Sequence, residues 1–501
     1  MPLPPPQSAD NMKRSCGILM HITSLPSPFG IGTLGKEALG FVDFLKAAKQ
    51  KYWQILPLNP TGFGNSPYQS FSAFAGNPYL IDFDTLCELG LLTKDDYEGI
   101  DWGNDPRRVD YGKIYLHRSE VLRKACDNLP KSEEYDEFCA ENAFWLDDYA
   151  LFMSLKSSFG GKPWYQWPLG LKTRNEQAVD GARSLLSDEE EYHKKVQYLF
   201  FGQWNALKAY ANESGIDIIG DLPIYVAHDS ADVWGNPRQF ELDGDFNPLR
   251  VAGVPPDGFS SEGQLWGNPI FDWEYMRKDG YRWWIKRLEH SLSLFDRLRI
   301  DHFRGFSSYY AVKYGMKNAV NGVWLKGPGI EFFKAVEASL GKPDIIAEDL
   351  GYVDEDVINL LKESGFPGMK VLQFAFDSRE NSDYLPHNYE KNCVVYIGTH
   401  DNDTLEGWFE NACHDDVEFA EKYLRLSEAE GKIKGVIKAA LSSVGETAVL
   451  TMQDLLHLGS FARMNTPSTA EGNWEWRALK EEIDFSLANE LAELVELYRR
   501  A

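Results

Sequence analysis

Short apolar runs recur along the chain and alternate with longer amphipathic stretches. Seven of these runs are rich in Ile, Val and Leu and end at turn residues: 16–22, 52–58, 216–222, 295–301, 344–350, 369–376 and 393–401. Their apolar positions are nearly continuous, which is typical of parallel strands buried on both faces. Helical patterns lie between them, at residues 36–49, 280–294, 329–340 and 354–363. The alternation predicts βα units, in either an open doubly wound sheet or a (β/α)₈ barrel.

Polar residues at the ends of the predicted strands favour the barrel. They stand at the C-terminal ends of several different runs: His21, Asp221, Asp301, Glu348, Asp377, His400 and Asp401. Catalytic groups spread over many strand ends are typical of a TIM barrel, whereas an open sheet concentrates its ligand at one switch point. We therefore predict an α/β fold built on a (β/α)₈ TIM barrel.

Two regions interrupt the alternation and predict insertions within a single catalytic domain over residues 16–501. Residues about 70–210 are charged, aromatic-rich and mostly helical in pattern. Residues about 228–275 are irregular and rich in Gly, Pro, Asp and Trp, as expected of an active-site lid. Residues 1–15 are expected to be an N-terminal extension, because they lack the apolar run of a signal peptide. Residues 485–499 predict an amphipathic helix that docks on the barrel.

The composition limits what the protein binds. The chain has 501 residues, of which 43% are apolar, and a net charge of −25. Such an acidic surface repels nucleic acid and anionic membranes. We therefore expect neither as a partner. No apolar run reaches about 18 residues, the length of a membrane span. The six cysteines form no C-x-x-C pair, which indicates reduced thiols, and we predict a cytoplasmic location.

The motifs for nucleotide binding and for nucleophilic Ser or Cys chemistry are weak. The stretch GIGTLGKE (30–37) resembles a phosphate-binding loop, but residues 23–29 separate it from the preceding strand. Glu37 also stands where a P-loop needs Ser or Thr. The chain contains no G-x-S-x-G elbow, and its cysteines have no obvious His partner. We predict neither kind of site.

A divalent-metal enzyme is an alternative that the residues leave open. The ten histidines include no H-E-x-x-H motif and no paired Cys/His spacing. Six side chains are nevertheless able to meet at a barrel mouth: His302, Glu348, Asp349, His400, Asp401 and Asp403. The residues alone do not decide between a metal site here and carboxylate chemistry.

Carboxylate chemistry is the other interpretation, with Asp301 and Glu348 as a nucleophile and a general acid. Asp301 lies between Arg299 and Arg304, and nearby positive charge is expected to lower its pKa and keep it ionised. Glu348 ends an apolar strand beside Asp349, so burial and a like charge are both expected to raise its pKa. Two carboxyl groups whose pKa values are pushed apart mark an acid/base pair. The alternative is that Asp301 and Arg299 form a purely structural ion pair.

Aromatic residues suggest a sugar as substrate. The chain has 15 Trp, 24 Tyr and 29 Phe, most of which belong to the core. Apolar sugar faces stack on aromatic rings, and their hydroxyl groups need carboxylates, amides or histidines. Tyr68 and Trp266 lie in glycine-rich loops, where core packing does not explain them.

Several motifs in order resemble one known family. They are SPYQSFSAFAGNPYLI, GDLPIYVAHDSADVW, PPDGFSSEGQLWGNP, RIDHFRG, IIAEDLG and GTHDN. Together they resemble the 4-α-glucanotransferases of glycoside hydrolase family 77, also called amylomaltases or disproportionating enzymes, from about residue 16 to the C-terminus. The resemblance implies a barrel with inserted, mostly helical subdomains and no C-terminal β-domain. It also implies that no metal or other cofactor is needed.

The resemblance also implies roles for individual residues. Asp301 would be the nucleophile, Glu348 the acid/base, and Asp401 would grip sugar hydroxyls and stabilise the transition state. The remaining residues implied to bind substrate are Arg299, His400, Asp221, Tyr68, Gln264, Trp266, Asp377 and Asn465. Arg299 would orient Asp301, and the loop at 254–269 is expected to close over the site and exclude water.

The activity implied is retaining transfer of α-1,4-glucan segments, through a covalent glucosyl-Asp, to the 4-OH of another glucan or of glucose. The expected glucans are malto-oligosaccharides, amylose, starch or glycogen. A hydrolase on the same scaffold, the metal-dependent enzyme and an inert glucan-binding protein remain alternatives. Net release of reducing ends would mark the hydrolase, and inhibition by EDTA would mark the metal enzyme. The intact set of Asp301, Glu348 and Asp401 argues against the inert protein.

Overall fold

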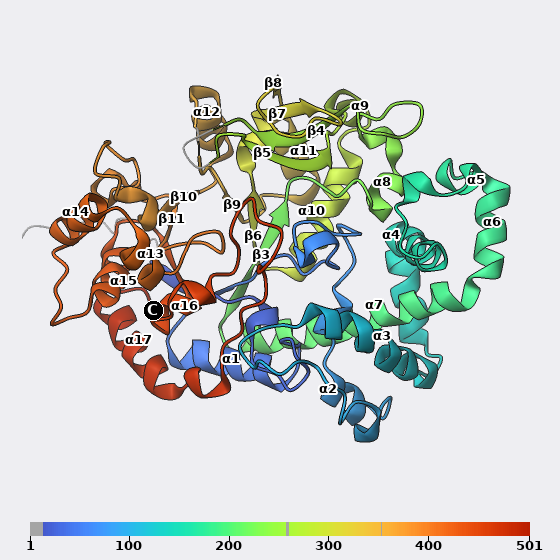
Figure 1. Ribbon diagram of the computed structural model, residues 1–501, viewed down its shortest axis with the longest axis horizontal. Coiled ribbons are helices and arrows are strands. Elements are labelled where there is room, and N and C mark those ends of the chain that lie inside the picture. The colour runs from blue at the N-terminus through green and yellow to red at the C-terminus, as the bar shows by residue number, and fades with distance from the viewer. Residues whose placement is uncertain (1–13, 257–259, 352) are drawn as a thin grey trace, which may run out of the picture.

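Eight parallel strands form a ring at the centre of the computed structural model, which describes residues 14–256, 260–351 and 353–501 (Figure 1). The strands are β1 (Ser15–Leu19), β2 (Tyr52–Gln54), β3 (Asp217–Pro223), β6 (Arg297–Asp301), β9 (Ile345–Ala347), β10 (Gly368–Val371), β11 (Cys393–Tyr396) and β12 (Thr447–Thr451). They are hydrogen-bonded in the order β10-β11-β12-β1-β2-β3-β6-β9, so spatial order follows chain order. The amide of Ala347 donates to the carbonyl oxygen of Pro367 at 2.9 Å, which joins the two ends of the sheet. The predicted α/β barrel is confirmed.

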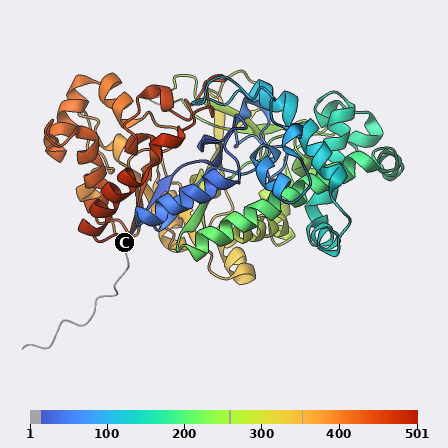
Figure 2. The ribbon, with the colours of Figure 1, turned by 90° about the horizontal axis from the view of Figure 1, so that it is seen from below.

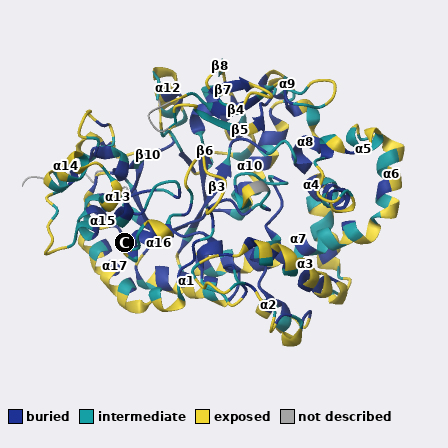
Figure 3. Ribbon diagram, viewed as in Figure 1, coloured by how far each residue is buried: buried dark blue, intermediate teal, exposed yellow. Residues whose placement is uncertain are grey.

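The apolar runs that predicted these strands are buried as expected. β11 and β12 are buried throughout, whereas many positions of α6 and α17 are exposed, as the colours of Figure 3 show. Seven of the eight strands coincide with predicted runs. The sequence prediction missed β12, because its five residues TAVLT begin and end with threonine and contain only three apolar side chains.

Helices follow the strands of the ring, most of them on its outside. They are α1 (Lys36–Ala47), α10 (Arg282–Leu294), α11 (Ile330–Leu340), α12 (Glu355–Ser364), α13 (Leu405–Asn411), α14 (His414–Leu424), α15 (Lys432–Ser442), α16 (Met452–Leu455) and α17 (Phe485–Leu497). Local sequence sets their ends. In α12, for example, the N-cap Asp354 accepts from the amide of Val357 at 3.0 Å, and Gly365 ends the helix with φ of 68°. A left-handed residue at this position favours glycine. After β12 the described chain forms α16, short 3-10 turns and an irregular segment, and then α17, where the amphipathic helix was expected.

Between β2 and β3 the chain forms a separate group of helices. They are α2 (Phe83–Glu88), α3 (Tyr111–Asn128), α4 (Glu133–Ser158), α5 (Leu169–Lys172), α6 (Glu176–Leu185) and α7 (Ser187–Glu213). In Figure 1 these helices lie on the right and α13–α17 on the left, and Figure 2 shows the same separation from below. This group falls within the region predicted as a helical insertion. The division into an extension, a barrel and two insertions remains a prediction, and residues 1–13 lie outside the described residues.

A four-stranded antiparallel sheet stands at one edge of the barrel mouth, at the top of Figure 1. Its strands, in the order β5-β4-β7-β8, are β4 (Arg250–Val254), β5 (Gln264–Pro269), β7 (Ser308–Lys313) and β8 (Gly322–Lys326). Two short helices, α8 (Ala231–Gly235) and α9 (Trp273–Lys278), flank β4 and β5. The segment predicted to be irregular therefore contains regular strands. The glycines of this segment made its strands hard to recognise in the sequence. One of them is required by the strand pair, because a Cβ at Gly253 would lie 2.4 Å from the carbonyl oxygen of Gln264.

Two arginines, one near each end of the described chain, lie at the closed end of the barrel, where the strands begin. Arg14 donates to the carbonyl oxygens of Tyr498, Leu441 and Ser443 at 2.6–2.8 Å. Arg500 is fully buried and donates to carbonyl groups of β1 and of the turn before β12. Each arginine thus bridges main-chain segments that are far apart in sequence.

Candidate active site

Asp301 and Glu348 come together where β6 and β9 end. Asp301 is the last residue of β6, and His302 follows it in a left-handed conformation with φ of 54°. This conformation directs the His302 amide to Glu348, and it donates to Oε2 at 2.7 Å. The amide of Leu350 donates to Oε1 of Glu348 at 2.9 Å. The residue after Asp301 thus holds Glu348 in place.

Arg299 joins Asp301 to the neighbouring strand. Its Nη2 donates to Oδ1 of Asp301 at 3.1 Å, and its Nη1 lies 2.7 Å from both carboxylate oxygens of Asp221. The strand register places Asp221 on β3 beside Arg299 on β6. Asp221 has no exposed side-chain surface and also accepts from the Tyr68 hydroxyl at 2.7 Å. Breaking such a buried pair costs about 3–5 kcal/mol, so this cluster fixes the orientation of Asp301.

The pKa of Asp301 differs from the sequence prediction. Burial raises its pKa well above its usual range, Arg299 lowers it, and the charges of Asp221 and Glu348 raise it further. Arg304, expected to be the second lowering charge, points elsewhere: it donates to Asp354 at 3.2 Å and its guanidinium lies over the ring of Trp324. The prediction of a low pKa is therefore wrong. The walls of the cleft surround Asp301, although 29% of its side-chain surface remains exposed.

The pKa of Glu348 is raised, as predicted. Burial is the largest cause and the charge of Asp349 adds to it, while Arg299 and the two backbone amides oppose it. Asp349 is itself held by the amide of Met369 at 2.7 Å. The charge of Glu348 also raises the pKa of Asp301, so the titrations of these two carboxyl groups are linked. Arg299 donates directly to Asp301 and acts on Glu348 through its charge, so it lowers the pKa of both carboxyl groups.

Replacing Arg299 with lysine is expected to move the acid limb of kcat/KM to higher pH. Lysine lacks the planar fork, so one ammonium group cannot serve both Asp221 and Asp301. With less positive charge beside it, Asp301 keeps its proton to higher pH, and the acid limb moves up by about 1 pH unit. At neutral pH we expect a loss of about 10²-fold. The pH profile of kcat/KM measures this, with Arg297→Lys, two residues earlier on β6, as the matched control; an unchanged acid limb would contradict the assignment.

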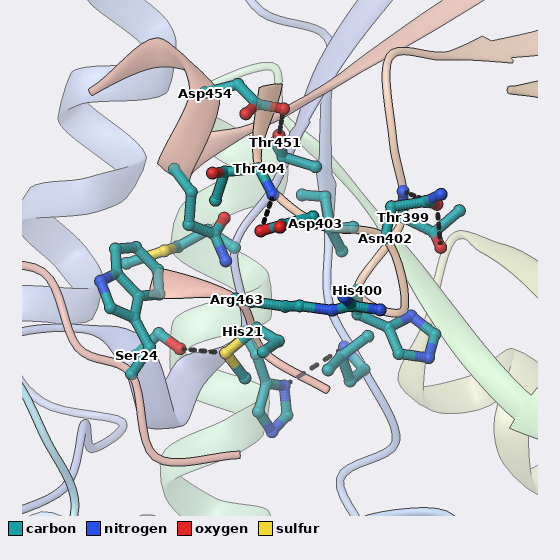
Figure 4. Close-up of a pocket in the computed structure, with 16 residues that line it drawn as sticks. His21, Ser24, Thr399, His400, Asn402, Asp403, Thr404, Thr451, Asp454 and Arg463 are labelled. Atoms are coloured by element: carbon teal, nitrogen blue, oxygen red, sulfur yellow. Dashed lines mark hydrogen bonds between the residues drawn. The ribbon is translucent and has the colours of Figure 1, made fainter. Parts of the chain in front are cut away.

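The loop after β11 (Cys393–Tyr396) supplies a second group of side chains. Asp401 has 47% of its side-chain surface exposed to the cleft, and its Oδ1 accepts from Nδ2 of Asn465 at 2.6 Å. His400 places Nε2 3.4 Å from the same oxygen and stacks its ring on that of Tyr68, with centroids 5.1 Å apart. His400 and His21 line one pocket (Figure 4), and burial lowers the pKa of both, that of His21 to about 3. Both imidazoles are therefore neutral hydrogen-bonding groups.

Strand β5 brings Gln264 and Trp266 to the same mouth. The ring of Trp266 packs edge-on against that of His302, with centroids 4.8 Å apart. Its indole N–H donates to Oε1 of Gln264 at 3.1 Å, and Gln69 donates to the carbonyl oxygen of Trp266 at 3.3 Å. Residues 257–259, in the predicted lid, lie outside the described residues. The described part of this loop thus borders the residue that follows Asp301.

The structure changes the expectation for two residues. Asp377 is bound by Arg379 at 2.6 and 2.8 Å, which lowers its pKa to about 2, rather than by the catalytic cluster. Tyr68 uses one ring face to stack on His400, so only its other surfaces remain for a ligand.

The sequence did not predict Arg463, which donates to the Asp401 carbonyl oxygen at 2.6 Å although the two residues are 62 positions apart in sequence. No local pattern marks such a contact.

The metal and nucleotide alternatives find no site in the described part of the chain. Over residues 14–256, 260–351 and 353–501, no group of three or more His, Cys, Asp or Glu side chains is arranged to hold a metal ion. The glycine-rich loop at 30–37 is filled by Asp82: its Oδ2 lies 2.2 Å from where a Cβ on Gly35 would stand, and Thr33 donates to it at 2.7 Å. A carboxylate of the chain itself therefore occupies the space that a phosphate would need.

Comparisons with known proteins show which family this chain resembles. A family model described as 4-alpha-glucanotransferase (Glyco_hydro_77) matches residues 20–481. A 4-alpha-glucanotransferase of Clostridium butyricum is 50% identical over 485 residues, which cover 96% of this chain and 100% of that one. One of Streptococcus pneumoniae is 48% identical, covering 97% and 98%. The solved amylomaltase of Streptococcus agalactiae in complex with acarbose is 47% identical, covers 98% of this chain and 100% of its own, and superposes with a TM-score of 0.95.

Proposed function

The chain belongs to the 4-alpha-glucanotransferase family, glycoside hydrolase family 77, and on this premise we propose which residues carry its reaction. Its activity is the transfer of α-1,4-glucan segments from one chain to another. The observation that supports our assignment is the junction of β6 and β9. There the amide of His302 binds Glu348 while Arg299 binds Asp301, so two carboxyl groups with different surroundings share one mouth.

The first half of the proposed reaction forms a covalent intermediate. Glu348 gives its proton to the glycosidic oxygen while Asp301 attacks C1 of the donor glucan. The C1–O bond breaks, the reducing-end fragment leaves as an alcohol, and the remaining segment is bound to Asp301 as an ester. Asp401 holds hydroxyl groups of the reacting sugar, with Arg299, His400 and Asp221 around it. The interaction of Asp401 strengthens as C1 gains positive character, which stabilises the transition state.

The second half transfers the segment. The 4-OH of a glucan or of glucose attacks C1, Glu348 takes the proton of that hydroxyl, and the bond to Asp301 breaks. Two inversions give net retention of configuration. The donors and acceptors we propose are malto-oligosaccharides, amylose, starch or glycogen, with glucose as the smallest acceptor. The acarbose complex of the related amylomaltase supports a glucan in this cleft.

Transfer rather than hydrolysis requires that water be kept from the ester. We propose that β5 and the adjoining loop do this, with Trp266 covering the region beside His302 and Gln264 fixing the indole. Asp377, Tyr68 and Asn465 are proposed to contact the glucan only secondarily, since each is engaged by another side chain.

Maltotriose with isotopically labelled glucose tests these proposals, in the wild type and in Trp266→Ala. We expect the wild type to give a ladder of longer oligomers, with label at their reducing ends, at a constant number of reducing ends. In Trp266→Ala we expect the ratio of hydrolysis to transfer to rise by about tenfold, because water reaches the ester. Mass spectrometry of the products, with reducing ends counted in parallel, measures both.

Trp324→Ala, on the far strand of the same antiparallel sheet, serves as the control for loss of a large indole. An unchanged ratio in Trp266→Ala would contradict the proposed lid, and unlabelled oligomers would contradict glucose as an acceptor. Loss of transfer on treatment with EDTA would contradict a reaction without a metal.

A cytoplasmic location is also proposed. It rests on six cysteines that are all free thiols, as is typical of a reducing compartment. Separately, the helices of the described residues include none that combines the length and the apolar character needed to cross a bilayer.

A further inference from the structure

One arginine connects the segment after β12 (Thr447–Thr451) to the loop that carries Asp401. Arg463 extends beside His400 in the pocket of Figure 4. Its Nη2 donates to the carbonyl oxygen of Asp401 at 2.6 Å. Its Nε donates to the carbonyl oxygen of Asn465 at 2.9 Å. The guanidinium thus spans two main-chain segments that are 64 residues apart in sequence.

The two segments are also bound to each other directly. Nδ2 of Asn465 donates to Oδ1 of Asp401 at 2.6 Å, and the amide of Asn465 donates to the carbonyl oxygen of His400 at 3.0 Å. With the two bonds of Arg463, these contacts form a closed ring. A shift of any member changes the place of the others.

The ring acts on a carboxylate that is about half exposed. Asp401 lies in a loop beyond the end of β11, and 47% of its side-chain surface is exposed to the cleft. Among the described residues, the carboxylate is held at Oδ1 by Asn465 and more distantly by His400. Arg463 contributes through both partners, because it fixes the main chain of Asp401 and the main chain of Asn465.

The chemistry of arginine suits this role. Its planar guanidinium donates in fixed directions, so two carbonyl groups bound by Nη2 and Nε are held at a set distance and angle. A lysine ammonium group donates from a single point at the end of a flexible chain and cannot impose that geometry. These two hydrogen bonds therefore require the shape of an arginine side chain, and not only its positive charge.

We propose that Arg463 is a positioning residue for catalysis, which sets the place of the Asp401 carboxylate relative to the reacting sugar. The inference rests on the proposed role of Asp401. It goes beyond that role by assigning the accuracy of the carboxylate's placement to a residue that acts through the main chain of Asp401 and of Asn465. Because the Asp401 contact is strongest in the transition state, loss of Arg463 acts on kcat rather than on KM.

The test is a double-mutant cycle of Arg463→Met with Asp401→Asn, with transfer from maltotriose as the readout. Alone, Arg463→Met is expected to reduce kcat between about tenfold and 10²-fold and to change KM by less than about twofold. Arg463→Lys is expected to recover only part of this loss. In the Asp401→Asn background, Arg463→Met is expected to reduce kcat by less than about twofold further, because its target is already gone.

Arg14→Met is the matched control, since Arg14 also bridges main-chain carbonyl groups, but at the closed end of the barrel. We expect it to lower the thermal midpoint and to leave kcat unchanged. Equal losses from Arg463→Met with and without Asp401→Asn would overturn the inference, as would a loss in kcat that Arg14→Met reproduces. If Asp401→Asn alone cost less than about tenfold, the proposed role of Asp401 would fail, and the inference with it.

Discussion

The Asp301→Asn variant is expected to lose at least about 10⁴-fold in glucan transfer while keeping its fold. Asparagine has the shape of aspartate, and its carbonyl oxygen still accepts from Nη2 of Arg299, which lies 3.1 Å from the carboxylate. It has no negative charge with which to form an ester at C1. The transfer rate on maltotriose measures the loss, and binding of the same substrate is expected to change far less.

The matched control is Asp344→Asn. Asp344 is paired with Arg297, two residues before Arg299 on β6, at the opposite end of the barrel. The same chemical change there removes a carboxylate from an arginine without touching the cleft, so activity within about twofold of the wild type is expected. A folded Asp301→Asn protein that kept more than about 1% of the transfer rate would contradict the assignment of the nucleophile.

Asp301→Asn is also expected to be at least as stable as the wild type at neutral pH. The folded-state pKa of Asp301 lies above its ordinary value, so the folded protein binds this proton more tightly than the unfolded chain does. The contribution of this group to stability is therefore present at low pH and is lost as the pH rises through the raised pKa. A neutral amide removes that loss. Thermal unfolding at neutral and at acid pH measures the difference, which should shrink as the pH falls.

Much of the fold was predictable because a barrel strand is encoded locally. A run such as residues 393–401 is apolar on both faces and ends in polar residues, and both features are visible without knowledge of its neighbours. β12 escaped prediction because two of its five residues are threonine. The small antiparallel sheet escaped because β4 and β5 contain glycines that break the alternation of side chains, and their pairing with β7 is set by contacts distant in sequence.

The candidate site was predictable to the extent that it lies at strand ends. Asp301, Glu348 and Asp401 each follow an apolar run, and the barrel brings such ends to one mouth. The direction of a side chain is not encoded in the same way. Arg304 follows Asp301 by three residues, yet it turns to Asp354, and Asp377 turns to Arg379. These outcomes depend on which partner lies nearest in the folded chain.

Replacing Glu348 with alanine is expected to reduce transfer from maltotriose by about 10³-fold, because the leaving oxygen loses its proton donor. Alanine is preferable to glutamine here. Each oxygen of Glu348 accepts a backbone N–H, from His302 and from Leu350, so the amide group of glutamine would face a donor. With alanine those two amides are free to bind water, and the space left is open to a small anion.

The proton-donor role makes the loss depend on the leaving group. A donor with a fluoride leaving group, such as α-maltosyl fluoride, needs no protonation, so Glu348→Ala is expected to form the ester on Asp301 at a rate near that of the wild type. The ester then accumulates, because no base activates the acceptor, and the mass of the intact protein rises by one maltosyl unit.

Azide, an anion that needs no base, is expected to release the maltosyl unit from the ester with retained configuration. Asp301→Ala with azide should instead give the inverted product, since azide then attacks the donor directly. An inverted product from Glu348→Ala would mean that Glu348 is the nucleophile and Asp301 the acid/base. Equal losses of rate on maltotriose and on the fluoride would contradict Glu348 as the proton donor.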